Sequence, residues 1–272
     1  MLLAALFHAV WNALIKSNAD RLSMMAYVAG GGSLLMLPLL PFAPFPSWEI
    51  WKIILLSLAL HTGYKVFLVK AYMHGDMGQV YPLARGTAPA IVTLVGFLFL
   101  GERLPLGATV GIVMILAGIV SLAWRSRNGA RGPTDPRAIF YALGTSVFIA
   151  SYTLNDGLGG RLAESASAYV IWLSALDGVS ITAIALWRRG PALLRPRRDM
   201  LLGLGGGFIS VVAYWLVIWA MSVTALGPVA ALRETSVVFG ALISGLILKE
   251  GLGARAIIAA CVVAAGVILL KM

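Results

Sequence analysis

The sequence predicts an all-α polytopic membrane protein with ten transmembrane helices, arranged as two inverted five-helix repeats. Three observations predict this fold: the composition, a series of long apolar runs, and an internal similarity between the two halves. Of the 272 residues, 60% are hydrophobic and 12% are charged, against roughly 25% charged residues in an average soluble domain. Too few polar side chains are left to cover a water-soluble surface, which excludes a soluble enzyme. The single cysteine, Cys261, excludes an internal disulfide and a thiolate metal cluster.

Ten apolar runs are long enough, or nearly so, to cross a bilayer, which takes roughly 20 helical residues. They cover residues 2–16, 22–42, 48–73, 79–100, 105–124, 138–157, 166–187, 200–223, 228–248 and 253–270. We expect helices because a spanning segment must satisfy its own backbone hydrogen bonds. A signal peptide is an alternative for the first run and would leave nine spans, but no basic segment precedes that run. Pro41, Pro44 and Pro46 end the second run.

The basic residues are concentrated on one face of the predicted bundle. The chain has 21 lysines and arginines against 11 acidic residues. Thirteen of the 21 fall in connections on one side and four in connections on the other, so the positive-inside rule puts both termini outside the cytoplasm. Nine of the thirteen are arginines in connections 125–137 and 188–199. Neither connection contains an aromatic residue, and we expect no nucleic-acid partner.

The two halves of the chain resemble each other. A shift of 148 residues aligns positions 83–122 with 231–270 and gives eleven identities, among them Arg85 with Arg233, Thr87 with Thr235 and Glu102 with Glu250. We therefore divide the chain into a first repeat (1–124), a basic connecting loop (125–137) and a second repeat (138–272). Because each repeat has five spans, the second enters the membrane from the opposite face. Inverted repeats are typical of transporters with a site at the midplane, although a duplication can also be retained for stability alone.

Several motifs resemble the drug/metabolite transporter superfamily, in its EamA-domain branch. They are Tyr81-Pro82-Leu83-Ala84-Arg85-Gly86-Thr87-Ala88-Pro89, Leu100-Gly101-Glu102-Arg103-Leu104, the second copies Leu232-Arg233-Glu234-Thr235 and Leu248-Lys249-Glu250-Gly251-Leu252, and the opening His8-Ala9-Val10-Trp11-Asn12-Ala13-Leu14. The resemblance covers essentially the whole chain. It implies ten helices around a central cavity in a secondary carrier, driven in several members by a proton or a counter-substrate.

The resemblance is specific for the superfamily and poor for substrate, since its members move amino acids, drugs, metabolites or nucleotide sugars. A further resemblance is to the branch associated with phosphonate utilisation, which suits a basic cavity. Familiar bacterial members of the family have both termini in the cytoplasm, whereas the charge count of this chain places them outside.

Charged side chains inside the apolar runs are the strongest site candidates, because a charge at bilayer depth costs several kcal/mol. Lys65 and Arg85 are expected at similar depth on adjacent antiparallel helices, where like charges repel unless an anion lies between them. Arg233 takes the matching position of the second repeat, toward the opposite entrance, with Glu234 beside it. Asp177, near the middle of the seventh run, is a candidate counter-ion or protonatable coupling group. A structural role for the two arginines, bonding carbonyls or Asp177, is the alternative.

Polar and aromatic side chains complete the predicted binding set. They are Tyr64, Tyr81, His8, Trp11, Asn12, Tyr214 and Trp215. His8 and Asn12 lie four residues apart and share a helix face, which indicates either a cavity-facing stripe or interhelical hydrogen bonds.

Other polar groups within the runs receive no part in the site. Lys70 and Asp156 lie near the ends of their runs, where side chains reach the headgroups, and we leave both out. His61 is noted within the third run without a role. Pro82 and Pro89 flank Arg85 and are expected to kink or unwind that helix.

The predicted function is secondary active transport of a small anionic or zwitterionic metabolite, because basic residues outnumber carboxylates within the runs. The alternatives are a proton-coupled amino-acid or drug exporter, in which Asp177 or Glu234 carries the proton, and a lipid flippase subunit. The three scattered histidines form no catalytic or metal-ligand motif, so we expect no enzyme activity, no cofactor and no metal. The expected surroundings are the bacterial inner membrane, with the lipid bilayer, the solute and a proton or counter-substrate as partners. A homodimer is compatible with the sequence.

Overall fold

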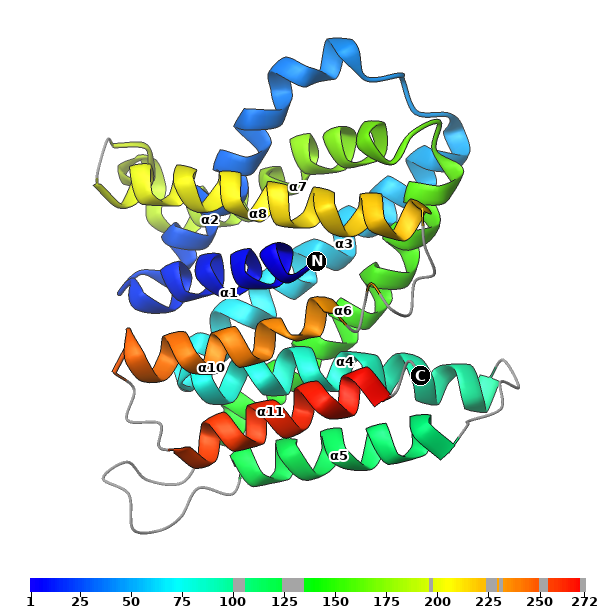
Figure 1. Cartoon of the computed structure of the whole chain (residues 1–272). Helices are drawn as coiled ribbons and strands as arrows, with labels where there is room; N and C mark the ends of the chain where they lie inside the picture. Colours follow the sequence, from blue (N-terminus) through cyan, green and yellow to red (C-terminus); the bar gives the residue numbers. More distant parts are fainter. Residues whose placement is uncertain are drawn as a thin grey trace.

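The structure is a computed structural model of the chain (Figure 1). It describes residues 1–99, 106–123, 135–195, 198–223, Val229, 232–249 and 254–269. All regular elements within these residues are helical. Glu102, Glu250, Arg125, Arg127, Arg131 and Arg197 lie outside the described residues.

The two halves of the chain form similar series of helices. In the first half these are α1 (Leu2–Ser17), α2 (Arg21–Met36), the 3-10 helix η1 (Leu37–Phe42), α3 (Trp48–His74), α4 (Met77–Phe99) and α5 (Leu106–Ala123). In the second half they are α6 (Pro136–Leu162), α7 (Ala166–Arg189), the 3-10 helix η2 (Gly190–Leu194), α8 (Arg198–Val223), α10 (Ser236–Leu246) and α11 (Ala254–Leu269). Side-chain oxygens of Asp20, Ser47, Asp135 and Ser165 cap the starts of α2, α3, α6 and α7.

Two predicted spans differ in length from the helices that form. The second run, predicted over 22–42, is α-helical only to Met36 and continues as the tighter η1, because Pro41 lies inside that segment and lacks a backbone donor. The sixth run, predicted to end at residue 157, continues as helix to Leu162. Apolarity alone set the predicted end, but hydrogen bonds from neighbouring helices allow the polar Asp156 to lie inside the helix.

The predicted unwinding beside Arg85 is wrong, because α4 is a continuous helix across Pro82 and Pro89. The interruption lies in the second half instead. Residues 232–234 are helical, Thr235 is a turn, and α10 begins at Ser236 rather than at residue 228. The backbone N–H of Thr235 bonds the carbonyl of Leu232 at 3.3 Å, a three-residue step that marks the break.

Five described helical segments are long and apolar enough to cross a membrane. They are Arg21–Phe42, Trp48–His74, Pro136–Leu162, Ala166–Leu194 and Arg198–Val223. Shorter apolar helices cover Leu2–Ser17, Thr109–Gly118 and Ile257–Leu269. These lengths and compositions fit a multi-pass membrane protein.

Helices of the two halves pack against each other throughout the molecule (Figure 1). Both α3 and α4 pack on α6, both α8 and α10 pack on α1, and α2 packs on α7 and α8. Two further contacts join α4 to α10 and α5 to α11. Figure 1 shows α5 and α11 at one end of the molecule and α2, α7 and α8 at the other, with α1, α3 and α6 between them.

Glycines allow α2 and α8 to lie directly against each other. A Cβ on Gly203 of α8 would lie 2.2 Å from the Cβ of Tyr27, and a Cβ on Gly207 would lie 2.6 Å from the backbone nitrogen of Gly32. Small residues at such positions let helix backbones approach closely in lipid. No larger side chain fits there without moving α2 away from α8.

A second pair of glycines forms the contact between α5 and α11. A Cβ on Gly118 would meet Val263 at 2.5 Å, and a Cβ on Gly266 would meet Ile115 at 3.0 Å. Gly118 therefore lies opposite Val263 rather than opposite Gly266, its match in the aligned repeats.

Candidate functional site

A cavity lies in the interior of the bundle and is lined by both halves of the chain. Helices α1, α2, α3, α7 and α8 supply most of its lining, with Arg85 from α4 and Tyr152 from α6. The cavity measures about 720 Å³, including the open space at its mouth, which is within the range of small-molecule sites. Its polar lining residues are His8, Trp11, His61, Tyr64, Lys65, Arg85, Tyr152, Ser174, Asp177, Ser210 and Tyr214. We call it the central cavity.

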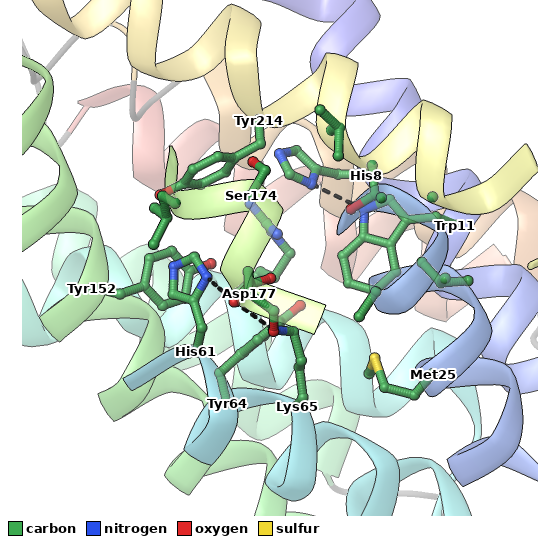
Figure 2. Close-up of a pocket in the computed structure, with 18 residues that line it drawn as sticks. His8, Trp11, Met25, His61, Tyr64, Lys65, Tyr152, Ser174, Asp177 and Tyr214 are labelled. Atoms are coloured by element: carbon green, nitrogen blue, oxygen red, sulfur yellow. Dashed lines mark hydrogen bonds and ion pairs between the residues drawn. The ribbon is translucent and has the colours of Figure 1, made fainter. Parts of the chain in front are cut away.

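Asp177 of α7 is the acceptor of the first polar cluster in the central cavity (Figure 2). Its Oδ1 lies 2.5 Å from Lys65 Nζ and 3.0 Å from His61 Nδ1, both on α3. Lys65 Nζ also donates to the backbone oxygen of Asp177 at 2.8 Å. His61 and Lys65 are four residues apart and so project from one face of α3 toward α7. The Asp177 side chain is 21% exposed, and it is therefore open to a ligand in the cavity.

Asp156 of α6 is fully buried on the other side of His61. Its Oδ2 lies 2.9 Å from His61 Nε2, and its Oδ1 accepts a hydrogen bond from the Tyr169 hydroxyl at 2.8 Å. The hydroxyls of Ser57 and Tyr214 also bond this carboxylate. Four groups from α3, α7 and α8 thus surround Asp156, and His61 joins it to the first cluster.

Glu234 forms a third cluster because two arginines share its carboxylate. Arg233 Nη2 lies 2.8 Å from Oε1, and Arg85 Nε lies 3.3 Å from Oε2. Arg233 Nη1 also donates to Thr153 Oγ1 at 3.2 Å, and the Arg85 guanidinium lies 5.8 Å from the centroid of the Tyr81 ring. All three charged groups are buried. Two guanidiniums and one carboxylate leave one excess positive charge in this cluster.

Two buried nitrogen atoms of cavity-lining residues have no hydrogen-bond partner in the part of the chain that the structure describes. They are Arg85 Nη2 and His8 Nε2. Trp11 Nε1 donates to His8 Nδ1 at 3.2 Å, so Nδ1 is the acceptor and the proton of the neutral ring is on Nε2. Both unpaired atoms are therefore donors. Because a buried donor without an acceptor is unfavourable, this part of the cavity favours an anionic or hydrogen-bond-accepting group.

The Ser33 side chain of α2 forms hydrogen bonds with two backbone groups of α7 beside Asp177. Its hydroxyl donates to the Ser174 carbonyl and accepts from the Gly178 N–H, each at 2.8 Å. These two backbone groups bond each other in a regular α-helix, and a side chain inserted between them is a common cause of bending. Ser33 therefore joins α2 to the backbone of α7 at the level of the central cavity.

A second pocket lies where α6 connects to α7 and η1 connects to α3. Its lining includes Phe45, Glu164, Tyr169 and Trp172, and we call it the outer pocket. The Trp172 indole donates to the backbone oxygen of Pro44 at 2.9 Å, at the edge of this pocket. Tyr169 lines the outer pocket, whereas its hydroxyl bonds the buried carboxylate of Asp156. Tyr169 therefore separates the outer pocket from the cluster around Asp156.

Two segments of the chain, residues 1–124 and 136–272, match the model of one protein family, described as the EamA-like transporter family. The chain belongs to the EamA-like transporter family. It is therefore a multi-pass membrane protein that transports small molecules, and the resemblance seen in the sequence is confirmed. A solved structure titled "Crystal structure of protein" is 19% identical, with 99% of this chain and 97% of that chain covered and a TM-score of 0.66; this likeness shows a shared fold. No curated protein matches the chain.

The structure of this EamA-like transporter brings most of the predicted site residues to the central cavity. Those that line it are His8, Trp11, Tyr64, Lys65, Arg85, Asp177 and Tyr214, whereas Asn12, Tyr81, Trp215, Arg233 and Glu234 lie outside its lining. Asn12 accepts a hydrogen bond from Tyr72 at 2.9 Å and so joins α1 to α3, which is the interhelical alternative considered above. Trp215 turns away and donates to Ser167 at 3.0 Å.

Two expectations about the basic residues are wrong. Arg85 and Arg233 do not lie toward opposite entrances, since both contact Glu234; the contact between α4 and α10 brings the two repeat-related segments together. Lys65 and Arg85 do not face each other across an empty anion site either. Each binds a carboxylate of its own, Asp177 for Lys65 and Glu234 for Arg85.

Two central residues of the site in this EamA-like chain, Asp156 and His61, were not predicted from the sequence. Asp156 was left out as a residue near a helix end, but it is fully buried six residues before the end of α6. His61 had an available signal, because its spacing of four residues from Lys65 puts both on one helix face. Lys70, also left out, is exposed and lies 5.2 Å from the centroid of the Tyr141 ring, outside the cavity lining.

Proposed function

We propose that this EamA-like chain is a secondary active transporter that carries a small zwitterionic or anionic metabolite by alternating access between inverted repeats. The central cavity is the substrate site in this proposal. Its binding residues are Lys65, Arg85, His8, Tyr64 and Tyr214, with Asp177 as the counter-ion.

The observation that carries the proposal is the separation of charge across the central cavity. On one side, the two arginines and Glu234 hold one excess positive charge, and Arg85 and His8 each present an unpaired donor. On the other side, the partly exposed carboxylate of Asp177 is available. A solute with a carboxylate, sulfonate or phosphonate at one end and an ammonium group at the other matches both sides. A purely anionic solute matches only the first, which is why the zwitterion is the better fit.

Helix contacts support the inverted repeat. In the inverted repeat, α1 to α5 correspond in order to α6, α7, α8, α10 and α11. The contact between α3 and α6 then corresponds to the contact between α8 and α1. The contact of α4 with α6 likewise becomes that of α10 with α1, and both members of each pair occur. Gly118 and Gly266 also face equivalent positions, Val263 and Ile115, which are 148 residues apart. Each of these equivalent glycines faces a residue three positions before the other glycine on the partner helix. This pattern indicates that α5 and α11 run antiparallel, as inversion requires.

Different packing of two equivalent helix pairs supports alternating access. Glycine contacts hold α2 tightly against α8. The equivalent pair, α7 and α3, is bridged by side chains instead, namely Lys65 with Asp177 and Thr62 with Ser180. Exchanging these two arrangements would close the central cavity on one side and open it on the other.

The Lys/Arg distribution supports an orientation with both termini on the non-cytoplasmic side of the bacterial inner membrane. Connections containing Lys16, Arg21, Arg188 and Arg189 would then face the cytoplasm. The outer pocket lies where α6 ends and α3 begins, and it would open on the non-cytoplasmic side.

Two alternatives fit the cavity less well. A lipid flippase needs an apolar lateral opening, whereas the lining of the central cavity holds charged residues from three helices, α3, α4 and α7. An exporter of cationic drugs would use Asp177, but it leaves the unpaired donors of Arg85 and His8 without an acceptor.

The proposal is tested with three solutes of matched shape: β-alanine, propionate and ethylamine. Propionate lacks the ammonium group of β-alanine, and ethylamine lacks its carboxylate. We expect β-alanine to raise the melting temperature of the purified protein more than either analogue, because binding to the folded state stabilises it. Arg85→Gln should remove the advantage over ethylamine, and Asp177→Asn the advantage over propionate. Equal stabilisation by ethylamine and β-alanine would refute an anion-binding end. Uptake of radiolabelled β-alanine into proteoliposomes then tests transport itself.

A further inference from the structure

His61 contacts a carboxylate with each of its two ring nitrogens. Nδ1 lies 3.0 Å from Asp177 Oδ1 and Nε2 lies 2.9 Å from Asp156 Oδ2. A neutral imidazole has one N–H donor and one lone pair. If both carboxylates were ionised, the lone pair of a neutral His61 would face a carboxylate oxygen without a proton between them. The two short contacts therefore require one more proton than a neutral imidazole with two ionised carboxylates contains.

The surrounding groups place this proton on His61. Asp156 also accepts from Ser57, Tyr169 and Tyr214, and these hydroxyl donors stabilise its ionised form. Asp177 is paired with Lys65, which stabilises that carboxylate in the same way.

The remaining groups around His61 do not supply a charge that changes this assignment. The Tyr152 ring of α6 lies at 4.4 Å and the Tyr214 ring of α8 at 5.6 Å, both edge-on to the imidazole. Tyr64 contacts Tyr152, and Arg85 is the nearest cation outside the network among the described cavity residues, already on Glu234.

The charge balance of the network agrees. With His61 as imidazolium, the two cations (His61 and Lys65) balance the two carboxylates (Asp156 and Asp177). Without the proton, the same four residues carry one excess negative charge inside the membrane-spanning region, which is unfavourable at that depth. The proton therefore leaves readily only when another positive charge takes its place.

We propose that His61, held between Asp156 and Asp177, is a proton-binding site of this transporter and is loaded from the outer pocket through Tyr169. This inference rests on the proposed function only in calling the protein a transporter. The binding site and its route follow from the hydrogen-bonded groups themselves.

The route is a continuous series of hydrogen bonds. A hydronium ion in the outer pocket, which Tyr169 lines, would give a proton to the Tyr169 oxygen and leave as water, while Tyr169 gives its own proton to Asp156 Oδ1, 2.8 Å away. The protonated carboxyl group of Asp156 then turns so that its O–H faces His61, and the proton passes to Nε2 across the 2.9 Å contact. His61 Nδ1 faces Asp177, whose carboxylate reaches the central cavity. No bond other than O–H and N–H is made or broken, and each proton that enters at Tyr169 is matched by one received at His61.

Gly159 makes this route possible. A Cβ on Gly159 would lie 2.3 Å from the Tyr169 ring, so only glycine leaves room for the ring where it lies. The position of Tyr169, which lines the outer pocket and bonds Asp156 through its hydroxyl, thus depends on a residue without a side chain.

The first test reads the protonation state of His61 directly and uses no solute. The chain has three histidines, His8, His61 and His74, so nitrogen NMR of protein labelled only in histidine, assigned by single His→Gln variants, resolves each ring. At neutral pH we expect His61 to show two protonated nitrogens and His8, with Nδ1 accepting from Trp11, to show one. In Asp156→Asn the network loses one negative charge, and His61 should become neutral. A neutral His61 in the unmodified protein overturns the proton site whatever the stability of the variant, and leaves the zwitterion proposal to its own test.

The second test compares two tyrosines that bond the same carboxylate. Tyr169→Phe removes the hydroxyl on the outer-pocket side of Asp156, and Tyr214→Phe removes the hydroxyl on the central-cavity side. We expect Tyr169→Phe to slow exchange of the His61 N–H protons with water by roughly tenfold or more, as loss of one charge-assisted hydrogen bond in the path implies. Tyr214→Phe should leave the exchange rate near that of the unmodified protein. Equal rates in the two variants, or slowing by Tyr214→Phe alone, would overturn the route.

Discussion

The hydroxyl of Tyr214 on α8 donates a hydrogen bond to the carboxylate of Asp156 on α6. An equivalent pair occurs in the first half, where Tyr72 on α3 donates to Asn12 on α1 at 2.9 Å. Each bond joins the third helix of a half to its first helix. The acceptor is a neutral amide in the first half and a carboxylate in the second. The equivalent hydrogen bonds therefore involve a charged group only in the second half of the chain. This difference distinguishes a structural hydrogen bond from one that also holds His61.

The shape and the charge of Asp156 can be separated by substitution. Asp156→Asn keeps an acceptor oxygen for the surrounding hydroxyls, whereas Asp156→Ala leaves the buried hydroxyls of Ser57 and Tyr169, and the partly buried hydroxyl of Tyr214, without their acceptor. Each orphaned buried group costs about 1–3 kcal/mol. We therefore expect Asp156→Ala to lower the melting temperature in detergent much more than Asp156→Asn. Equal losses would mean that the charge, and not the hydrogen-bond geometry, dominates stability at this position.

Glu234 should be among the most sensitive charged residues in the fold. Glu234→Gln leaves Arg85 and Arg233 buried without a carboxylate, and breaking a buried ion pair in this way costs about 3–5 kcal/mol. Glu49→Gln is the matched control, because Glu49 pairs with Lys52 at 2.9 Å with side chains 74% and 53% exposed, and such pairs contribute about 0–1 kcal/mol. Denaturant titration of the two variants measures both values. A loss for Glu234→Gln as small as that of the control would show that the two arginines find other acceptors.

Most of the fold could be predicted from the sequence, because membrane-spanning helices follow directly from apolar length. The wrong predictions concern helix breaks and helix ends, where tertiary contacts outweighed the local sequence preference. Pro82 and Pro89 do not interrupt α4, while the break at Thr235 has no proline or glycine among the described residues 232–239 around it. The end of α6 was misplaced because a polar residue was taken as the limit of the buried segment.

The candidate site was only partly accessible from the sequence. Intramembrane charge identified Lys65, Arg85 and Asp177, which line one cavity. Which carboxylate pairs with which base could not be predicted, because the partners lie more than a hundred positions apart, as with Lys65 and Asp177 or Arg85 and Glu234. The sequence also predicted an excess of cations within the membrane, and in the structure the cluster around Glu234 holds two guanidinium groups against one carboxylate.

Neighbouring glycines on α8 provide a test of helix packing. A Cβ on Gly203 would lie 2.2 Å from the Cβ of Tyr27, whereas a Cβ on Gly205 has nothing within 4 Å. Gly203→Ala should therefore destabilise the protein by about 1–3 kcal/mol, the usual cost of overpacking. Gly205→Ala should be neutral or stabilising by about 0.5–1 kcal/mol, since alanine favours a helix over glycine. Thermal unfolding of the two variants under one detergent condition measures the difference, and equal values would contradict the tight contact of α2 with α8.

The orientation of the chain is open to a reporter test. Alkaline phosphatase is active only outside the cytoplasm, so a fusion after residue 272 should be active if both termini are non-cytoplasmic. A fusion within the connection 190–195, beside Arg188 and Arg189, should be inactive under the positive-inside rule. The opposite pattern would invert the proposed topology and move the outer pocket to the cytoplasmic side.

Ionised Asp20 stabilises the folded protein, and we expect this contribution to be lost at acid pH. It caps α2 through Ser23 and forms two contacts with Arg189, of 2.9 and 3.0 Å. Partial burial alone would raise the pKa of Asp20, but the hydrogen bonds from Arg189 and Ser23 and the charge of Arg189 outweigh it, so the pKa lies below its usual value. The ionised form is thus favoured in the folded state, and its contribution is complete above the ordinary aspartate pKa of about 3.9.

This contribution should disappear as the pH falls through the lowered pKa of Asp20 in the folded protein. Asp20→Asn keeps a capping oxygen but no charge, so its deficit in melting temperature should be constant from neutral pH down to about pH 4, shrink as the pH falls further, and vanish below the lowered pKa of Asp20. Asp20→Ala also loses the cap, worth about 1 kcal/mol, and should stay less stable than Asp20→Asn at every pH. High salt should shrink the deficit of Asp20→Asn, because the pair with Arg189 is partly exposed. Melting curves from neutral to acidic pH, at low and high salt, separate the cap from the ion pair, and an Asp20→Asn deficit that persists below the pKa of Asp20 would rule out the ion pair as its source.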